Sequence, residues 1–285
     1  MGRHFLRRLD GQHCARTPGD RLRTDSRGTG ARRNHRMDPS RESDGGDVMN
    51  ELALPALLGI RMKSEERRAA LVLLVGVVFT TLHRQACGVD VLPAVGMLNS
   101  ETARTWLYFV LSLALFAVIP AVIVKRGFRK SLSDYGVRLG DWKFGLITVS
   151  VLLPVISVAM LLPAAQMEDM RAAYPVDKTA MLSAPMFLQY AVGRVLLFYV
   201  AWEFFFRGFL LFGIRDAVGD AMAIAITTLP SALWHIGYPV GELYSSIAAG
   251  LLFGWLAVRT RSILWPLLLH AGIGLVTDLS ITLSV

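Results

Sequence analysis

The feature that most constrains this chain is a series of long apolar runs that begins near residue 66 and continues to the C-terminus. Seven runs approach or reach the roughly 17–25 residues that an α-helix needs to cross a bilayer. They cover residues 66–84, 104–124, 143–163, 186–213, 218–236, 243–259 and 262–282. Alternation with period two, the mark of a transmembrane barrel, is not seen in series. The sequence therefore predicts an all-α, polytopic transmembrane helix bundle of about seven spans.

The charged residues are placed as loop charges of a membrane protein. The formal net charge is +8, and 53% of the 285 residues are hydrophobic. Arg and Lys gather before the first run and in the connections after the second, fourth and sixth runs. Cytoplasmic loops carry such an excess, so we expect the N-terminus inside and the C-terminus outside, in a bacterial plasma membrane with lipid as its surroundings. No aromatic-rich basic module accompanies the charge, which argues against nucleic acid as a partner.

Residues 1–60 differ in composition from the rest of the chain, since they are rich in Arg, Gly, Asp and Ser and poor in aliphatic residues. Such a segment buries too little apolar surface to offset the entropy lost on ordering. We expect a disordered Arg-rich tail at 1–60 and a transmembrane helical domain at 66–285. A natural start at Met37, Met49 or Met62 and a genuine cytoplasmic tail both stay open.

Four ionisable residues lie inside or at the end of apolar runs: Glu203, Arg207, His235 and His270. Such groups are expensive in hydrocarbon, so they mark a functional site by default and face the bundle interior. Glu203 and Arg207 are four residues apart and share a helix face, which fits either a structural ion pair or a carboxylate base oriented by arginine. His270 lies well inside a run, so we favour a functional role for it over a structural one. His235 lies at the end of a run, where a histidine is more often an interfacial hydrogen-bonding residue.

Three motifs, taken in order, make residues 188–285 resemble the CPBP family of intramembrane proteases, which includes CAAX prenyl endopeptidases and Abi-type immunity proteins. The sequences WEFFFRG at 202–208, SALWH at 231–235 and HAGIG at 270–274 resemble E-E-x-x-x-R-G, F-x-x-x-H and H-x-x-x-N/D. The resemblance implies a metal-dependent endopeptidase that hydrolyses a peptide bond of a peptide or membrane-protein substrate near the membrane. It implies catalytic roles for Glu203, Arg207, His235 and His270. Zn²⁺, bound by the two histidines, is the expected cofactor, since imidazole and carboxylate groups suit that ion.

Three positions depart from these motifs. Trp202 stands where the family has its first Glu, the residue taken to activate water. Ser231 replaces the motif Phe, and Gly274 replaces the Asn or Asp that is thought to help hold the oxyanion or the metal site. Because Trp202 and Gly274 replace polar residues of the motifs, we expect a site with few ligands, weak metal affinity and low activity.

Beside Glu203 itself, we consider two acidic residues as replacements for the carboxylate that the motif has at position 202. Glu242 follows a Gly-Tyr-Pro break, so its side chain can fold back toward His235. Asp278 lies eight residues after His270, about 12 Å along a straight helix, which is too far to share a ligand sphere.

Two further classes of function stay open. One is a non-catalytic membrane scaffold or immunity-type protein that keeps the polar cluster for packing or recognition. The other is a small proton-coupled transporter with Glu203 and the histidines as relay groups, although transport predicts polar groups along several spans and the first three runs offer few. The protease hypothesis requires that Glu203, His235 and His270 face a common cavity.

Overall fold

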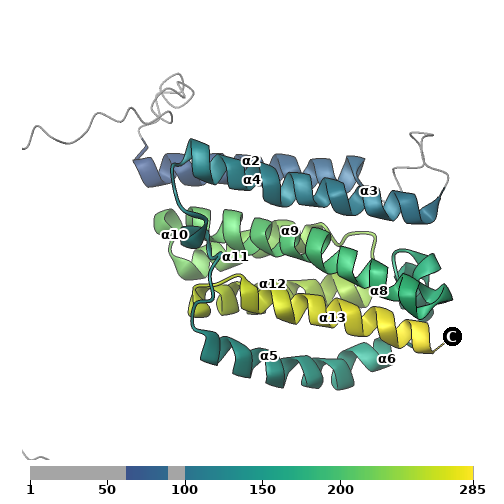
Figure 1. Cartoon of the computed structure of the whole chain (residues 1–285). Coiled ribbons are helices and arrows are strands. Elements are labelled where there is room, and N and C mark those ends of the chain that lie inside the picture. The colour runs from purple at the N-terminus through teal and green to yellow at the C-terminus, as the bar shows by residue number, and fades with distance from the viewer. Residues whose placement is uncertain (1–61, 89–99, 285) are drawn as a thin grey trace, which may run out of the picture. The chain divides into compact units, whose positions relative to one another are not determined.

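The computed structural model describes residues 62–88 and 100–284, all within one compact unit, Gly46–Val285. The regular structure of these residues is helical throughout (Figure 1). Six of the described helices are long and apolar enough to cross a membrane: Ser64–Ala86, Glu101–Gly127, Trp142–Ala164, Ala184–Val218, Val240–Thr260 and Leu264–Leu283. The predicted all-α polytopic bundle is thereby confirmed, whereas the tail predicted at 1–60 lies outside the described residues.

The run at 218–236 forms a shorter helix than the sequence predicts. Helix α11, Asp220–Leu233, has 14 residues, fewer than the roughly 17 that a straight span needs. A turn follows it, in which Gly237 adopts a φ of 95°, a left-handed conformation that favours glycine. The chain then enters the next helix after Pro239. The prediction of a full-length fifth span is therefore wrong, because the glycine turn ends the helix early.

The described residues form the following helical segments, most of them labelled in Figure 1. The α-helices are α2 (Ser64–Ala86), α3 (Glu101–Leu113), α4 (Ile119–Val122), α5 (Trp142–Ile156), α6 (Leu162–Ala164), α7 (Glu168–Ala173), α8 (Ala184–Gly193), α9 (Val200–Glu203), α10 (Gly213–Val218), α11, α12 (Val240–Thr260) and α13 (Leu264–Leu283). The π-helical segments are Ala114–Val118, Ile123–Gly127, Ser157–Leu161, Arg194–Tyr199 and Phe204–Phe212. Short 3₁₀ segments cover Leu132–Tyr135 and Lys178–Leu182.

The span Ala184–Val218, which contains α8, α9 and α10, forms the centre of the bundle. In its most apolar stretch 78% of the residues are buried, against 33% or less in the other spans. It packs against α3 and α4 on one side and against α12 and α13 on the other, and α5 covers α13 (Figure 1). A helix that is apolar on every side belongs in such a buried position.

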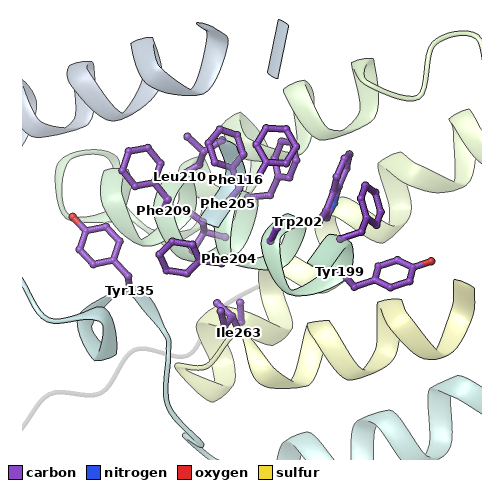
Figure 2. Packing of buried hydrophobic residues seen from close by; sticks show 14 of the residues in the cluster. Phe116, Tyr135, Tyr199, Trp202, Phe204, Phe205, Phe209, Leu210 and Ile263 are labelled. Atoms are coloured by element: carbon purple, nitrogen blue, oxygen red, sulfur yellow. The ribbon is translucent and has the colours of Figure 1, made fainter. Parts of the chain in front are cut away.

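Aromatic side chains fill the core between the central span and its neighbours (Figure 2). The rings of Phe116 and Phe205 stack with their centroids 4.4 Å apart, and Phe209 continues the stack from the next turn. Trp202, one turn before Phe206, lies at the end of this cluster nearest to Tyr199. The aromatic core therefore holds the WEFFFRG segment rigidly on both sides of Glu203.

Candidate active site

Glu203 is the last residue of α9, lies between two π-helical segments, and is fully buried. Its Oε1 accepts a hydrogen bond from Nη1 of Arg207 at 3.1 Å, so the pair expected from the four-residue spacing is present. The same oxygen lies 2.6 Å from Nδ1 of His270, which comes from α13. Glu203 thus links the first motif to the third, and π-helical segments of this kind are frequent at functional sites.

The hydrogen-bond partners of the two histidines fix which ring nitrogen carries a proton. The Glu203 carboxylate only accepts, so Nδ1 of His270 is the donor and its Nε2 keeps a free lone pair. Nδ1 of His235 lies 2.8 Å from the carbonyl oxygen of Ser231, which likewise only accepts. Burial lowers the pKa of His235 to about 4, so this imidazole is neutral near pH 7. Both histidines therefore leave Nε2 as a basic atom.

One cavity of about 250 Å³ brings the two histidines together. Its wall is mostly apolar and aromatic, and its polar side chains include Arg194, His235, Glu242 and His270. Such a lining, with a few convergent polar groups, is typical of a ligand site. Glu203 and Arg207 are not among the described residues of this wall, so Glu203 reaches the cavity through His270 rather than directly.

Trp202 occupies the space beside both imidazoles. Its ring centroid lies 5.8 Å from that of His235 and 6.3 Å from that of His270, in edge-on arrangements. The side chain is almost completely buried and forms part of the cavity wall. An indole has one N–H donor and no basic atom. The position where the family motif has its first carboxylate therefore supplies no proton acceptor here.

The hydroxyl of Tyr199 occupies the space beside Gly274. A Cβ atom at position 274 would collide with that hydroxyl. The Tyr199 ring also packs edge-on against His270, with centroids 4.8 Å apart. Where the motif has an Asn or Asp side chain, this chain therefore places a phenol O–H from the central span, a residue that sequence analysis missed.

Glu242 lies close to His235, as the break at Gly237 suggests. Its Oε1 is 3.8 Å from Nε2 of His235 and accepts a 2.6 Å hydrogen bond from the hydroxyl of Tyr174. Burial is the main cause that raises the pKa of Tyr174, so the phenol stays protonated and remains a donor. The cavity therefore holds a carboxylate on the His235 side as well as the one behind His270.

A buried ion pair between Arg194 and Asp278 closes another part of the cavity. The arginine also donates to the hydroxyl of Tyr190 at 3.0 Å, and its guanidinium lies over the ring of Tyr199, 5.2 Å from the centroid. Asp278 pairs with Arg194 rather than with His270, in keeping with its distance along α13. Sequence analysis missed Arg194, although opposite charges in two apolar runs are a signal for such a pair.

The described residues contain no group of three or more His, Cys, Asp or Glu side chains placed to hold one metal ion. Catalytic zinc sites use three protein ligands and one open position. Here two imidazoles line the cavity, and the nearest carboxylate behind one of them, Glu203, already accepts from His270 and Arg207. This donor set does not fit such a centre, and zinc at His235 and His270 stays a prediction.

Residues 183–276 match the family model of type II CAAX prenyl endopeptidase Rce1-like proteins. No curated protein and no solved structure matches the chain. The matched range contains all three motifs, Trp202, Tyr199, Arg194 and Glu242, and ends two residues before Asp278. The apolar helices make the chain an integral membrane protein. The resemblance predicted from the motifs is thereby confirmed, and residues 183–276 are similar to the Rce1-like type II CAAX prenyl endopeptidases.

Proposed function

We propose that this protein is an intramembrane endopeptidase in which His270, oriented by Glu203, is the base that activates water. The observation that carries the proposal is the 2.6 Å contact between Nδ1 of His270 and Oε1 of Glu203 in a cavity wall. A carboxylate behind an imidazole fixes its tautomer and stabilises the imidazolium that forms when the base takes a proton. Arg207 pairs with the same carboxylate, with its Nη1 3.1 Å from Oε1 of Glu203.

The reaction begins with a water molecule between the imidazoles and the scissile carbonyl group. Nε2 of His270 takes a proton from this water, and the water oxygen forms a bond to the carbonyl carbon. Nε2 of His235, which is neutral and has its Nδ1 bound to Ser231, accepts from the same water and orients it. Aromatic rings around the cavity exclude bulk water from this step.

Two donors near His270 stabilise the oxyanion that forms on the former carbonyl oxygen. The ring of Tyr199 packs edge-on against His270 with its hydroxyl beside Gly274, and the guanidinium of Arg194 lies in the same wall. Donors aimed at developing charge in a water-poor site usually make the largest contribution to catalysis. The C–N bond then breaks, and the leaving amine takes the proton from the His270 imidazolium, which restores the neutral base.

The substrate class that fits the proposal is a peptide or the terminal segment of a membrane protein. The cavity lies within the helices of a membrane protein and has a largely apolar wall. A volume of about 250 Å³ is slightly below the roughly 300–1,000 Å³ of drug-sized sites, so the cavity takes a short, extended apolar segment.

A library of quenched fluorescent peptides with varied apolar C-terminal residues tests the proposal. The full chain is reconstituted in phosphatidylcholine and phosphatidylglycerol vesicles, and the rate of fluorescence release is measured for each peptide. We expect hydrolysis of a subset, and a loss of roughly 10²–10⁴-fold in His270→Gln, because that variant keeps the hydrogen bond to Glu203 but has no general base.

His83→Gln is the matched control. It removes another buried imidazole, which bonds Ser112 and Trp234 and is not in the described cavity wall. Equal losses in both variants would assign the effect to folding. Unchanged hydrolysis in a folded His270→Gln variant would remove His270 from the reaction.

Trp202 supports a second candidate function, a non-catalytic membrane protein of the same family. Its indole fills the position of the water-activating carboxylate and contacts both imidazoles. This alternative expects no hydrolysis by the natural chain and hydrolysis by Trp202→Glu, which places a carboxylate between the two histidines. The peptide library distinguishes the two functions, since the protease proposal expects activity before that change.

A further inference from the structure

A second pocket, of about 360 Å³, lies away from the histidines and is lined by basic side chains from four separate parts of the chain. Arg68 comes from the first turns of α2, Arg215 from α10 and Arg261 from the turn after α12, while Lys130 and Arg138 come from the connection between α4 and α5. These segments lie at one end of the helices in Figure 1. The sequence assigned these residues to loops on one side of the membrane, and the structure gathers them around one pocket.

The pocket keeps a surplus of positive charge after its internal ion pairs are counted. Five cationic side chains face two carboxylates of the wall, Asp134 and Asp216. Arg215 also pairs with Asp220 outside the wall at 2.7 Å, which leaves two positive charges in excess. Arg68 donates to Asp216 at 2.7 Å, but its Nε is buried and has no hydrogen-bond partner among the described residues. Lys130 is exposed. Unpaired donors at a concentrated positive charge favour an anion.

The pocket also offers neutral donors and one phenyl ring. The phenol of Tyr135 lies in its wall, and burial raises the pKa of Tyr135 to about 12, so the hydroxyl stays protonated. Figure 2 places Tyr135 at the edge of the aromatic core. The hydroxyl of Ser133 and the ring of Phe212 complete the wall. Arginine, lysine and hydroxyl donors around one pocket suit a phosphate group.

The position of the pocket identifies the phosphate as that of a lipid. Every basic residue of the wall lies in the end turn of a span or in the connection next to one. Val137 and Leu139, on either side of Arg138 in the chain, are exposed. Exposed apolar side chains at this place suit contact with lipid chains, whereas a free phosphate ion in water would not require them. Basic pockets between transmembrane helices bind anionic head groups in this way.

We propose that this basic pocket, formed by Arg68, Lys130, Arg138, Arg215 and Arg261, binds the phosphate head group of an anionic membrane lipid. The bound lipid joins α2, the connection between α4 and α5, α10 and the α12–α13 turn at the membrane surface. The site is separate from the histidine cavity, so it does not depend on whether the protein hydrolyses peptides.

Native mass spectrometry of the full chain in detergent tests the proposal, with phosphatidylglycerol and phosphatidylcholine of the same acyl chains as probes. We expect phosphatidylglycerol to bind more tightly than phosphatidylcholine. Lys130→Gln should lower the affinity for phosphatidylglycerol about fivefold, which is the effect of one basic residue near an anionic head group. The control is Lys125→Gln, which removes an equally exposed lysine five residues earlier that is not in the described pocket wall.

Three results would overturn the proposal. Equal affinity for the two lipids would show that the pocket does not recognise an anionic head group. Equal losses in Lys130→Gln and Lys125→Gln would assign binding to general surface charge. Inorganic phosphate that displaces phosphatidylglycerol at equal concentration would make free phosphate, rather than a lipid, the ligand of the pocket.

Discussion

At the scale of single residues, two aromatic side chains take over positions where the family motifs have polar groups. Trp202 fills the place of a carboxylate, and the hydroxyl of Tyr199 fills the space that a side chain at position 274 would need. The two changes are coupled to the same neighbour, because both rings pack against His270. Beside these rings, Glu203 and His270 remain as a polar pair joined by a 2.6 Å contact.

Gly274→Ala should destabilise the protein by about 1–3 kcal/mol, because the added methyl group collides with the hydroxyl of Tyr199 in a close-packed core. The double variant Gly274→Ala with Tyr199→Phe should recover part of this loss. Thermal unfolding in detergent measures both. If the loss is the same with and without the Tyr199 hydroxyl, that contact is not its cause.

Glu203→Gln should cost more stability than a typical surface change. It leaves the buried Arg207 without its counter-charge, a loss on the order of 3–5 kcal/mol for a well-buried pair. Adding Arg207→Met should restore part of the free energy of unfolding. Chemical unfolding of the two single variants and the double variant gives the coupling, and strictly additive losses would mean that the two side chains do not interact.

At the scale of helices, glycine positions decide how closely neighbouring spans approach. Helix α5 exposes most of its surface, and at Gly145 its backbone lies directly against the indole of Trp265 on α13. The Trp265 N–H also donates to the carbonyl oxygen of Leu139 at 2.9 Å. Small residues at such contacts let transmembrane helices pack closely. The Gly145–Trp265 contact therefore helps to dock α5, beside partly buried apolar side chains of α5 that pack against Trp265 and Leu269.

Gly145→Ala should lower the unfolding temperature, because the methyl group overlaps the Trp265 ring and the cost exceeds the gain in helix propensity of about 1 kcal/mol. The matched control is Gly241→Ala in the first turn of α12, where the space around the Cβ position is open. That variant should be neutral or slightly stabilising. Unfolding scans followed by tryptophan emission compare the two, and equal effects would contradict a docking role for Gly145.

At the scale of the whole molecule, the helical unit that contains the site lies within Gly46–Val285. We expect a chain that begins at Met62 to insert and to remain stable in detergent, because residues 1–61 lack the apolar content to contribute to a core. Membrane fractionation and size-exclusion elution test this expectation. Degradation of the short chain under conditions where the full chain survives would contradict it.

The sequence was sufficient for the helix bundle, because apolar runs of span length leave few alternatives in a bilayer. It also identified the Glu203–Arg207 pair and the return of Glu242 toward His235, since both follow from local spacing and a glycine turn. It did not reveal that Tyr199 fills the space beside Gly274 or that Arg194 pairs with Asp278. Those contacts join residues 75 and 84 positions apart, and only the packing of α13 against the central span brings them together.

The position of Trp202 also makes its fluorescence a probe of the histidine cavity. Indole emission responds to nearby imidazoles and to the water around the ring, and Trp202 contacts both cavity histidines while Trp234 contacts His235. These are two of the six tryptophans in the chain. A molecule that enters the cavity changes the surroundings of both rings, so its occupancy can be followed by intrinsic fluorescence without a label.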